Sequence, residues 1–431
     1  MDTAIAGSAA VPERFAMRSV LAIDVGTSRV RAIVGRTGKN GPWIAGVSEV
    51  QSFGIDKGLV VDVEEAARSL AAAVSEVLRE AAAPFDSAYL AISGGRVSSL
   101  EACGKVVIIS ADKVVTAGDC RAAINEAIRK AGMPYDYEEI QAIPTRFKVD
   151  GASISKNPVG LKADSLEANV HLVAVPSNAV ANFEEAARRA GLGPVRFAFK
   201  PLASARGILG EGDCPNCAVI DLGGGTSGLA ILADGAVIRS CTFPLGGINI
   251  TRDLSLGLKI PFAEAEEIKR EFGMAVGSSA DELDFIALGS SGDGKDRVIS
   301  KRYVCQIIEA RLEEIFKLAS SEIKSSADAG AAPVEVFLTG GSSRIQGIEE
   351  LASRVFGLPV RTRSPRALDG LGNLSPELSA AMGTFLLAVE LAEGEGGSLF
   401  PPPTATAELV SKIKRSLTRL VSRGAGAQHL A

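Results

Sequence analysis

The sequence of 431 residues contains only two histidines and six scattered cysteines. Catalysis by a histidine base would therefore depend on His171, because His429 lies near the end of the chain. His171 stands in an apolar run, which favours a half-buried strand histidine. Scattered cysteines are typical of reduced thiols rather than of a disulfide framework. Cys214 and Cys217 have redox or metal spacing, but no second pair or nearby histidine completes a zinc site.

Long apolar runs and a basic domain are also missing. No stretch approaches the roughly 20 apolar residues that a transmembrane helix needs. Residues 1–17 contain no run long enough for a signal peptide, and they are predicted to be a disordered N-terminal extension. We therefore expect the protein to be made and to stay in the cytoplasm. The net charge of -5 gives no reason to expect nucleic acid as a partner.

Two stretches of the chain share one pattern. In each, an apolar run ends at an aspartate, a glycine-rich turn with threonine follows, and an apolar run resumes. The pattern predicts two β-hairpins, with Asp24 and Asp221 before their turns. Backbone N–H groups of glycine can surround phosphate oxygens, hydroxyls add donors, and each aspartate can hold a hydrated Mg²⁺. Two such turns from two lobes predict a nucleotide site between them.

Other phosphate-binding motifs fit poorly. No Gly-x-x-x-x-Gly-Lys-Ser/Thr run exists, and the triple glycine 223–225 leads into a strand pattern, unlike a dinucleotide-binding turn. A third turn, 340–342, leads from a strand pattern into the helical run 346–356. It suits either contact with adenosine or a simple strand-to-helix turn with serine as N-cap, and its sequence leaves both open.

The three turns in this order resemble the actin, Hsp70 and hexokinase superfamily. Within it, the chain is similar over almost its whole length to the FtsA family of bacterial cell-division proteins. The similar stretches are 54–58, 89–94, 156–160, 244–247, 265–269 and 338–342. The resemblance implies an α/β, two-lobed actin-like (ribonuclease-H-like) fold with an FtsA-type inserted subdomain and a C-terminal amphipathic helix.

The resemblance also implies that ATP and Mg²⁺ bind between the lobes. The implied binding residues belong to two phosphate loops, the loop after the second hairpin, a charged helix and the adenosine turn. They are Asp24, Gly26, Thr27, Ser28, Asp221, Gly223, Gly224, Gly225, Thr226, Gly246, Gly247, Glu266, Lys269, Gly340, Gly341 and Ser342. Asp24 and Asp221 would hold Mg²⁺ through water. Without the resemblance, the charged run around Glu266 and Lys269 predicts a solvated helix face.

Related proteins often carry an acidic residue just after the second phosphate loop, where this chain has Ser227 and Gly228. A carboxylate near the phosphates would help to handle metal or activate water. The resemblance therefore implies ATP binding with weak or absent ATPase activity. If hydrolysis occurs, Asp221 is the candidate catalytic residue.

The resemblance divides the chain into four subdomains and a tail. The predicted segments are subdomain 1A (18–96 and 176–216), the inserted subdomain 1C (97–175), subdomain 2A (217–243 and 323–391), subdomain 2B (244–322), a flexible linker (392–407) and an amphipathic helix (408–423). Local patterns also predict helices over 63–82 and 118–132 and strands over 104–110 and 147–149.

The tail has the pattern of a membrane-binding helix. Its apolar residues fall on one side at helical spacing, and lysine and arginine occupy the remainder. The predicted membrane contacts are Leu409, Val410, Ile413, Lys414, Arg415, Leu417, Leu420 and Val421. A helix docked on the body is the alternative, but the linker and the basic residues favour an anionic membrane surface.

We therefore expect an ATP-binding, actin-like protein that polymerises on the cytoplasmic face of the bacterial inner membrane at the division site. The resemblance implies that this peripheral membrane protein binds the C-terminal tail of FtsZ through subdomain 2B and so anchors FtsZ filaments at the septum. It also implies self-association into filaments and contacts with other divisome proteins through the inserted subdomain. The alternatives are an actin-fold sugar or acetate kinase, an Hsp70-like chaperone ATPase and a pilus-assembly adaptor of the same fold. The basic tail has no role in the kinase, and the chaperone would need a further substrate-binding domain.

Overall fold

The computed structural model describes residues 19–393, apart from 38–40, 83, 95, 155–156, 211–212, 289–296, 329–331, 369–371 and 373. The predicted extension 1–17 and the predicted membrane helix 408–423 lie outside the described residues, as does the predicted linker apart from its first two residues. Among the helices within the described ranges, none is both long and apolar enough to cross a membrane.

The first lobe is built on a five-stranded sheet with the order β11-β6-β1-β2-β3. Its antiparallel part consists of β1 (Ser19–Val25), β2 (Arg29–Arg36) and β3 (Trp43–Gln51). The strands β6 (Ser87–Ile92) and β11 (Val195–Phe199) run parallel to β1. Every residue of β1 is buried because helices cover both faces of the sheet.

One face of this sheet packs against α1 (Val63–Ala81) and α3 (Ser177–Arg189). The predicted helix over 63–82 is thus confirmed, and Asp62 caps it by accepting a hydrogen bond from the N–H of Glu65 at 3.0 Å. The opposite face packs against α9 (Ser379–Glu393). The alternation of β1 side chains explains both contacts, since successive residues point to opposite faces.

The second lobe repeats the arrangement with the order β14-β13-β12-β17-β18. Here β12 (Cys217–Leu222), β13 (Ser227–Ala233) and β14 (Ala236–Phe243) are antiparallel. The strands β17 (Glu335–Thr339) and β18 (Val360–Thr362) run parallel to β12. Both predicted hairpins, β1–β2 and β12–β13, are confirmed.

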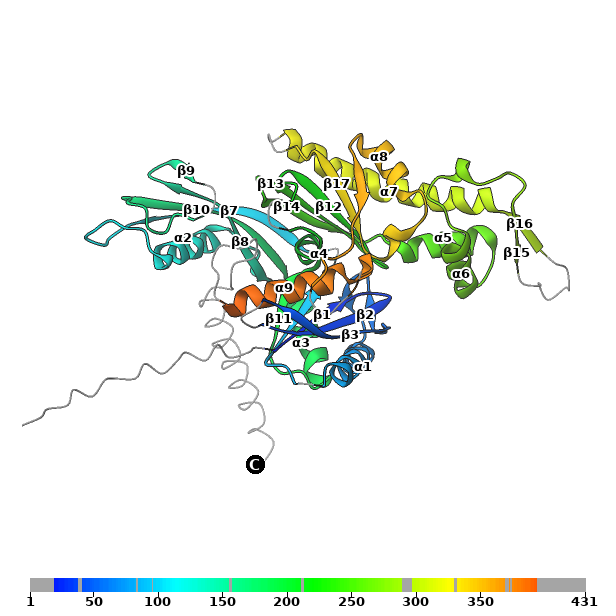
Figure 1. Ribbon diagram of the computed structural model, residues 1–431, viewed down its shortest axis with the longest axis horizontal. Helices are drawn as coiled ribbons and strands as arrows, with labels where there is room; N and C mark the ends of the chain where they lie inside the picture. Colours follow the sequence, from blue (N-terminus) through cyan, green and yellow to red (C-terminus); the bar gives the residue numbers. More distant parts are fainter. Residues whose placement is uncertain are drawn as a thin grey trace, which may run out of the picture.

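Two helices lie between the sheets: α4 (Lys200–Ile208) and α9 (Figure 1). They approach each other at glycines. A Cβ added to Gly383 of α9 would lie 1.6 Å from the carbonyl oxygen of Ala203, and one added to Gly207 of α4 would lie 2.2 Å from that of Ser379. Because no side chain fits at these points, the two helix backbones are in direct contact.

The inserted subdomain is an antiparallel sheet with the order β7-β10-β8-β9, covered by α2 (Ala117–Lys130). Its strands are β7 (Ser98–Val107), β8 (Tyr137–Val149), β9 (Ala152–Ile154) and β10 (Ser165–Pro176). The predicted helix over 118–132 is confirmed, and the predicted strand over 147–149 is the end of β8. The strand predicted over 104–110 begins earlier and ends at Val107. The insert projects to the left in Figure 1.

The small subdomain of the second lobe lies at the opposite end of the molecule (Figure 1). It contains α5 (Gly247–Leu258), α6 (Phe262–Phe272), η1 (Gly277–Ser279) and the hairpin of β15 (Phe285–Leu288) with β16 (Arg297–Ser300). The long helix α7 (Lys301–Asp328) continues through the predicted boundary between residues 322 and 323. One apolar cluster therefore joins the small subdomain to the second sheet.

Short elements connect the longer strands and helices of both lobes. After β3, the strands β4 (Ile55–Asp56) and β5 (Leu59–Val60) form a small hairpin. After β17 the chain enters η2 (Gly341–Arg344) and then α8 (Ile348–Phe356). The turn η3 (Pro376–Leu378) precedes α9. The predicted helical run 346–356 is therefore confirmed except at its start, because α8 begins at Ile348.

Candidate functional site

The two predicted phosphate turns, one from each lobe, lie directly against each other. A Cβ added to Gly224 would lie 2.3 Å from Oγ of Ser28, and one added to Gly225 would lie 2.4 Å from Oγ1 of Thr27. Such approaches are too close for a side-chain carbon, so any other residue at these positions would displace Ser28 or Thr27. The turns thus form one surface on which no glycine side chain covers the backbone and the hydroxyls of Ser28 and Thr27 are adjacent to it.

Each turn is closed in the same way. The N–H of Gly26 donates to the carbonyl of Arg29 at 3.2 Å, and the N–H of Gly223 donates to the carbonyl of Thr226 at 3.0 Å. Thr226 also lies within hydrogen-bond distance of Ser93, with 3.2 Å between the two hydroxyl oxygens. Ser93 follows β6, so the second turn touches the sheet of the first lobe.

The loop after β14 and the third glycine turn lie beside the second phosphate turn. The N–H of Gly247 donates to the carbonyl of Gly223 at 3.0 Å, and Oγ of Ser342 donates to the same oxygen at 3.4 Å. A Cβ on Gly246 would lie 2.6 Å from that oxygen as well. The structure therefore brings together segments that are far apart in the sequence.

Lys269 and Glu266 lie one turn apart on α6 and face this group of turns. Nζ of Lys269 donates to Glu266 Oε2 at 2.6 Å, to Thr251 Oγ1 at 2.7 Å and to the carbonyl of Gly247 at 3.1 Å. Burial lowers the pKa of Lys269, and Glu266 opposes that shift. The local interpretation as a solvated helix face is thus wrong for Lys269, whose ammonium group lies beside the glycine turns. Its contact with a nucleotide, which the resemblance implies, stays a prediction.

The two glycines of the third turn have different surroundings. Gly340 has φ of 86°, in the left-handed region, and a Cβ there would lie 2.2 Å from Oδ1 of Asp221. A Cβ on Gly341 would meet no described atom within 4 Å. The first glycine is therefore required by packing, and the second leaves an open surface next to Ser342 that suits a flat group.

The aspartates of the two hairpins are both buried beneath the turns. Oδ1 of Asp24 lies 2.7 Å from Nζ of Lys200, and its Oδ2 lies 3.9 Å from Arg31. Asp221 accepts a hydrogen bond from Oγ of Ser204 at 2.8 Å. Burial raises the pKa of Asp221, although Lys200 opposes the shift. Burial would lower the pKa of Lys200, but the charges of Asp24 and Asp221 outweigh it and raise the pKa.

Three residues of this group were not anticipated from the sequence: Lys200, Arg31 and Ser204. Lys200 follows a buried strand and precedes Pro201, which marks the first turn of a helix but says nothing about the lysine. Arg31 stands in an alternating strand where a charged residue normally faces water. The strand register places Arg31 opposite Asp24 on β1 and Glu49 on β3, and Arg31 bonds to Glu49 at 2.7 Å. Only the fold, which places α4 below both turns, gives Lys200 and Ser204 their partners.

The predicted Mg²⁺ ligands fit a metal poorly. Oδ2 of Asp221 is bonded to Ser204, and the backbone of Gly340 covers its Oδ1. Asp24 already has Lys200 as its counter-ion. Over the described ranges, no group of three or more histidine, cysteine, aspartate or glutamate side chains is arranged to hold a metal ion. The metal and catalytic roles of the two aspartates therefore remain predictions.

His171 and the cysteine pair lie away from the turns. His171 lies on β10 and is fully buried rather than half-buried, with Nε2 2.7 Å from Oγ of Ser240 on β14. Burial lowers its pKa to about 4. Burial, together with Cys214, raises the pKa of Cys217 to about 12, which disfavours a reactive thiolate.

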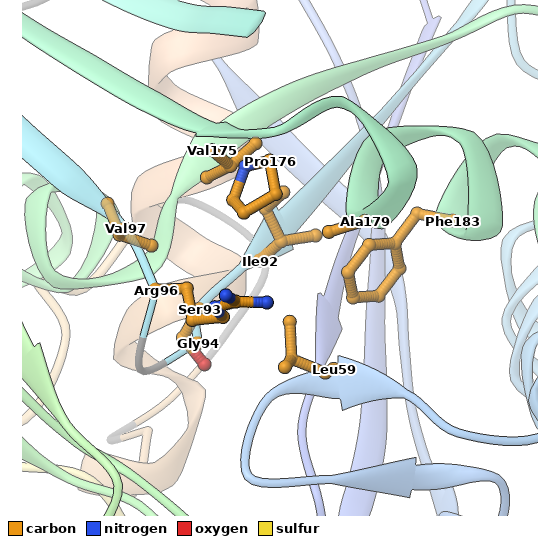
Figure 2. Close-up of a pocket in the computed structure, with 10 residues that line it drawn as sticks. All are labelled: Leu59, Ile92, Ser93, Gly94, Arg96, Val97, Val175, Pro176, Ala179 and Phe183. Carbon is orange, nitrogen blue, oxygen red and sulfur yellow. The ribbon is translucent and has the colours of Figure 1, made fainter. Parts of the chain in front are cut away.

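A small pocket lies where the insert joins the first lobe (Figure 2). Its walls include Ile92, Val175 and Phe183, and Arg96 is the charged residue among those that line it. It touches Ser93 but not the glycine turns, and the described residues that line it include no carboxylate or histidine. We therefore place the candidate site at the turns and not in this pocket.

Comparison with known proteins gives the family. The family model for the cell division protein FtsA matches residues 218–383, and the model for the SHS2 domain inserted in FtsA matches residues 94–174. The cell division protein FtsA of Neisseria meningitidis is 31% identical over 414 residues, which cover 92% of this chain and 97% of that protein. The chain belongs to the FtsA family. FtsA of Pseudomonas aeruginosa is 29% identical over 407 residues, with the same shares of 92% and 97%.

Solved structures of lower identity agree on the fold. The PilM–PilN type IV pilus biogenesis complex matches with a TM-score of 0.61 and 20% identity, over 86% of this chain and 98% of that chain. MreB5 of Spiroplasma citri bound to ADP matches with a TM-score of 0.51 and 14% identity, over 87% and 98%. The predicted two-lobed actin-like fold is thus confirmed, and the SHS2 match confirms the inserted subdomain of this FtsA-family protein.

Proposed function

We propose that this FtsA-family protein binds ATP between its lobes and anchors FtsZ filaments to the membrane during cell division. The observation that carries the ATP site is the meeting of two bare phosphate turns with the third glycine turn. Backbone N–H groups in such concavities suit phosphate oxygens. MreB5 of Spiroplasma citri, which shares the fold, has ADP bound in its solved structure.

Within this site the residues divide by chemistry. Phosphates would lie on the turns that contain Thr27 and Thr226, where hydroxyls supplement the backbone donors. Adenosine would lie on the open face of Gly341, with Lys269 and Glu266 at its edge. Because Asp221 is enclosed, it is poorly placed to activate a water molecule, which supports weak or absent hydrolysis.

Membrane attachment would come from the predicted helix 408–423. Each basic residue near an anionic surface contributes roughly 1 kcal/mol, and insertion of the apolar side adds to it. One such helix binds reversibly, so polymers of the protein would bind more tightly through avidity. The protein would then act on the cytoplasmic face of the inner membrane at the division site, as a peripheral membrane protein.

Partner binding would use the two subdomains that project from the body. Leu283, Phe285 and Val298 of the small subdomain are 82%, 61% and 66% exposed, which suits the docking of an FtsZ tail. In the insert, Val107 and Ile109 are 66% and 91% exposed. These side chains suit contacts with other divisome proteins or with a second copy in a filament.

The test is co-sedimentation with anionic liposomes, with and without Mg-ATP. The full chain is compared with a chain that ends at Ala407. We expect only the full chain to pellet, and more of it when ATP is present. If both forms stay in solution under all conditions, the tail is no anchor and a soluble actin-fold enzyme becomes the better account. Addition of FtsZ filaments to the pelleted protein then tests recruitment.

A further inference from the structure

Lys200 occupies an unusual position at the floor of the nucleotide site. It is the first residue of α4, the helix between the two sheets, and only 8% of it is exposed. Nζ lies 2.7 Å from Oδ1 of Asp24, in the first lobe. The charge of Asp221, in the second lobe, also stabilises the ammonium group. One cation therefore serves the aspartates of both hairpins.

This cation also lies directly below the first phosphate turn. A Cβ placed on Gly26 would be 3.7 Å from Nζ of Lys200. Since glycine has no such atom, the ammonium group faces the bare backbone of the turn. Phosphate oxygens held by the N–H groups of this turn would be within reach of a charge-assisted hydrogen bond from Lys200.

Asp24 is paired without a metal ion. Lys200 is its close partner at 2.7 Å, and Arg31, which is bonded to Glu49 at 2.7 Å, lies 3.9 Å away. The charge of Lys200 also acts on Asp221. Two free carboxylates would attract a divalent cation and repel the phosphates of ATP. A carboxylate that is already paired with a cation attracts a divalent metal ion less strongly and repels the phosphates of ATP less strongly.

We propose that the Lys200 ammonium group is the cation that meets the terminal phosphates of a bound nucleotide, in place of a metal ion held by Asp24 and Asp221. The proposal rests on the proposed ATP site. The ligand chemistry is a polyphosphate chain on the first turn, as in a nucleoside triphosphate. Nucleotide binding by this protein should therefore depend little on Mg²⁺.

A purely structural lysine would behave differently. If Lys200 only balanced Asp24, its removal would lower the stability of the fold but would not change how binding responds to Mg²⁺. Lys200→Met keeps most of the side-chain volume and removes the charge. The double variant Lys200→Met, Asp24→Asn removes both charges of the pair and so avoids the buried, unpaired Asp24 carboxylate that the single variant leaves.

A lysine in the insert provides the matched control. Lys148 forms an ion pair of the same length, 2.7 Å, with Glu167 on the neighbouring strand. Lys148→Met therefore loses an ion pair of the same length, in a more exposed place and far from the glycine turns. Any effect common to Lys148→Met and Lys200→Met reflects the loss of an ion pair in general.

The experiment is equilibrium binding of a fluorescent ATP analogue to the full chain, in Mg²⁺ and in EDTA. We expect EDTA to change the affinity of the unaltered protein and of Lys148→Met by less than about threefold. Lys200→Met and the double variant should bind at least about tenfold more weakly in EDTA, and Mg²⁺ should restore part of that loss.

Two results would overturn the proposal. One is a loss of more than about tenfold in EDTA by the unaltered protein, and the other is undiminished binding in EDTA by the double variant. If the unaltered protein binds no analogue in either buffer, the proposed ATP site is wrong. The proposed role of Lys200 is then wrong as well, because it depends on that site.

Discussion

The sheets of the two lobes have the same strand order and the same strand directions, and both place an aspartate at the end of the central strand. The surroundings of these aspartates differ. Asp24 is paired with the Lys200 ammonium group, whereas Asp221 is bonded to the Ser204 hydroxyl and covered by Gly340. The repeated backbone thus provides the same glycine-rich turn twice, while side chains from outside the sheet set the charge beneath each turn.

The outer strands differ in a second way. In the first lobe β3 is the last strand of its sheet. In the second lobe the equivalent strand, β14, is held by the insert: His171 of β10 bonds to the Ser240 hydroxyl, and Ser99 of β7 donates to the carbonyl of Ser240. The insert arises from the first lobe, so these contacts join the lobes at a point away from the cleft.

The largest expected effect concerns the aspartates. Asp24→Asn leaves the buried Lys200 without its closest counter-ion, and loss of one partner of a buried ion pair typically costs about 3–5 kcal/mol. Asp221→Asn keeps a group of the same shape beside Ser204 and should cost about 1–3 kcal/mol. Urea unfolding of both variants measures the difference. Equal losses of unfolding free energy would contradict the comparison, because they would show that Asp24 and Asp221 are stabilised to the same extent by their surroundings.

The next effect tests the contact that only the second lobe has. His171 has a pKa of about 4 in the fold against roughly 6.5 when unfolded, so the unfolded state binds more protons between these values. The stability is complete above pH 6.5, and roughly 3 kcal/mol should be lost as the pH falls to about 4. His171→Gln should flatten the fall in melting temperature between pH 7 and pH 5.

His429 supplies the control for that measurement, since it is the other histidine of the chain. His429→Gln should keep the pH dependence of the unaltered protein. If His171→Gln keeps it too, the contact between β10 and β14 does not depend on a neutral imidazole.

Glycine substitutions sharpen the comparison at the turns. Gly225→Ala forces the second turn away from Thr27, which should cost about 1–3 kcal/mol of stability. Because the displaced turn would no longer surround the phosphates, we also expect ATP to bind about tenfold more weakly. Gly341→Ala adds a methyl group to open space, so it should leave the melting temperature unchanged. A fall in ATP affinity with Gly341→Ala would then report adenosine on the third turn. Unchanged ATP affinity with Gly225→Ala would contradict a phosphate site there.

The smallest expected effect compares the equivalent threonines. Oγ1 of Thr27 accepts from the N–H of Gly58 at 3.3 Å, and Oγ1 of Thr226 lies 3.2 Å from Ser93 Oγ. Each contact is long, so Thr27→Val and Thr226→Val should each lower the unfolding free energy by about 1 kcal/mol. Urea unfolding measures both variants. If their unfolding free energies differ by more than about 1 kcal/mol, the two threonine hydroxyls do not stabilise their turns equally.

Much of this architecture could be predicted from the sequence, because it depends on local patterns. Apolar runs that end in Asp24 and Asp221 predict the strands, and the glycines predict the tight turns. The mutual contact of the turns also required that the two hairpins belong to two lobes facing each other. That step came from the number and order of the turns and from the family resemblance.

The ion pair below the turns could not be predicted. Lys200 and Asp24 are far apart in the sequence, and no local sequence pattern around either residue indicates the other as its partner. Their contact depends on where α4 crosses between the sheets. The burial of His171 was underestimated for a related reason, since the strand that covers it, β14, belongs to the other lobe.

The backbone contact between α4 and α9 has a mechanical consequence. The chain leaves the body through α9 on its way to the predicted membrane helix, and an ion pair between Arg206 and Glu390 adds to the contact of the two helices. The opposite end of α4 begins with Lys200, beneath the first phosphate turn. Force on the tail would therefore pass through α9 and α4 to the residues beneath the proposed nucleotide site. Tension at the membrane would then affect nucleotide binding, and nucleotide binding would affect the response to tension.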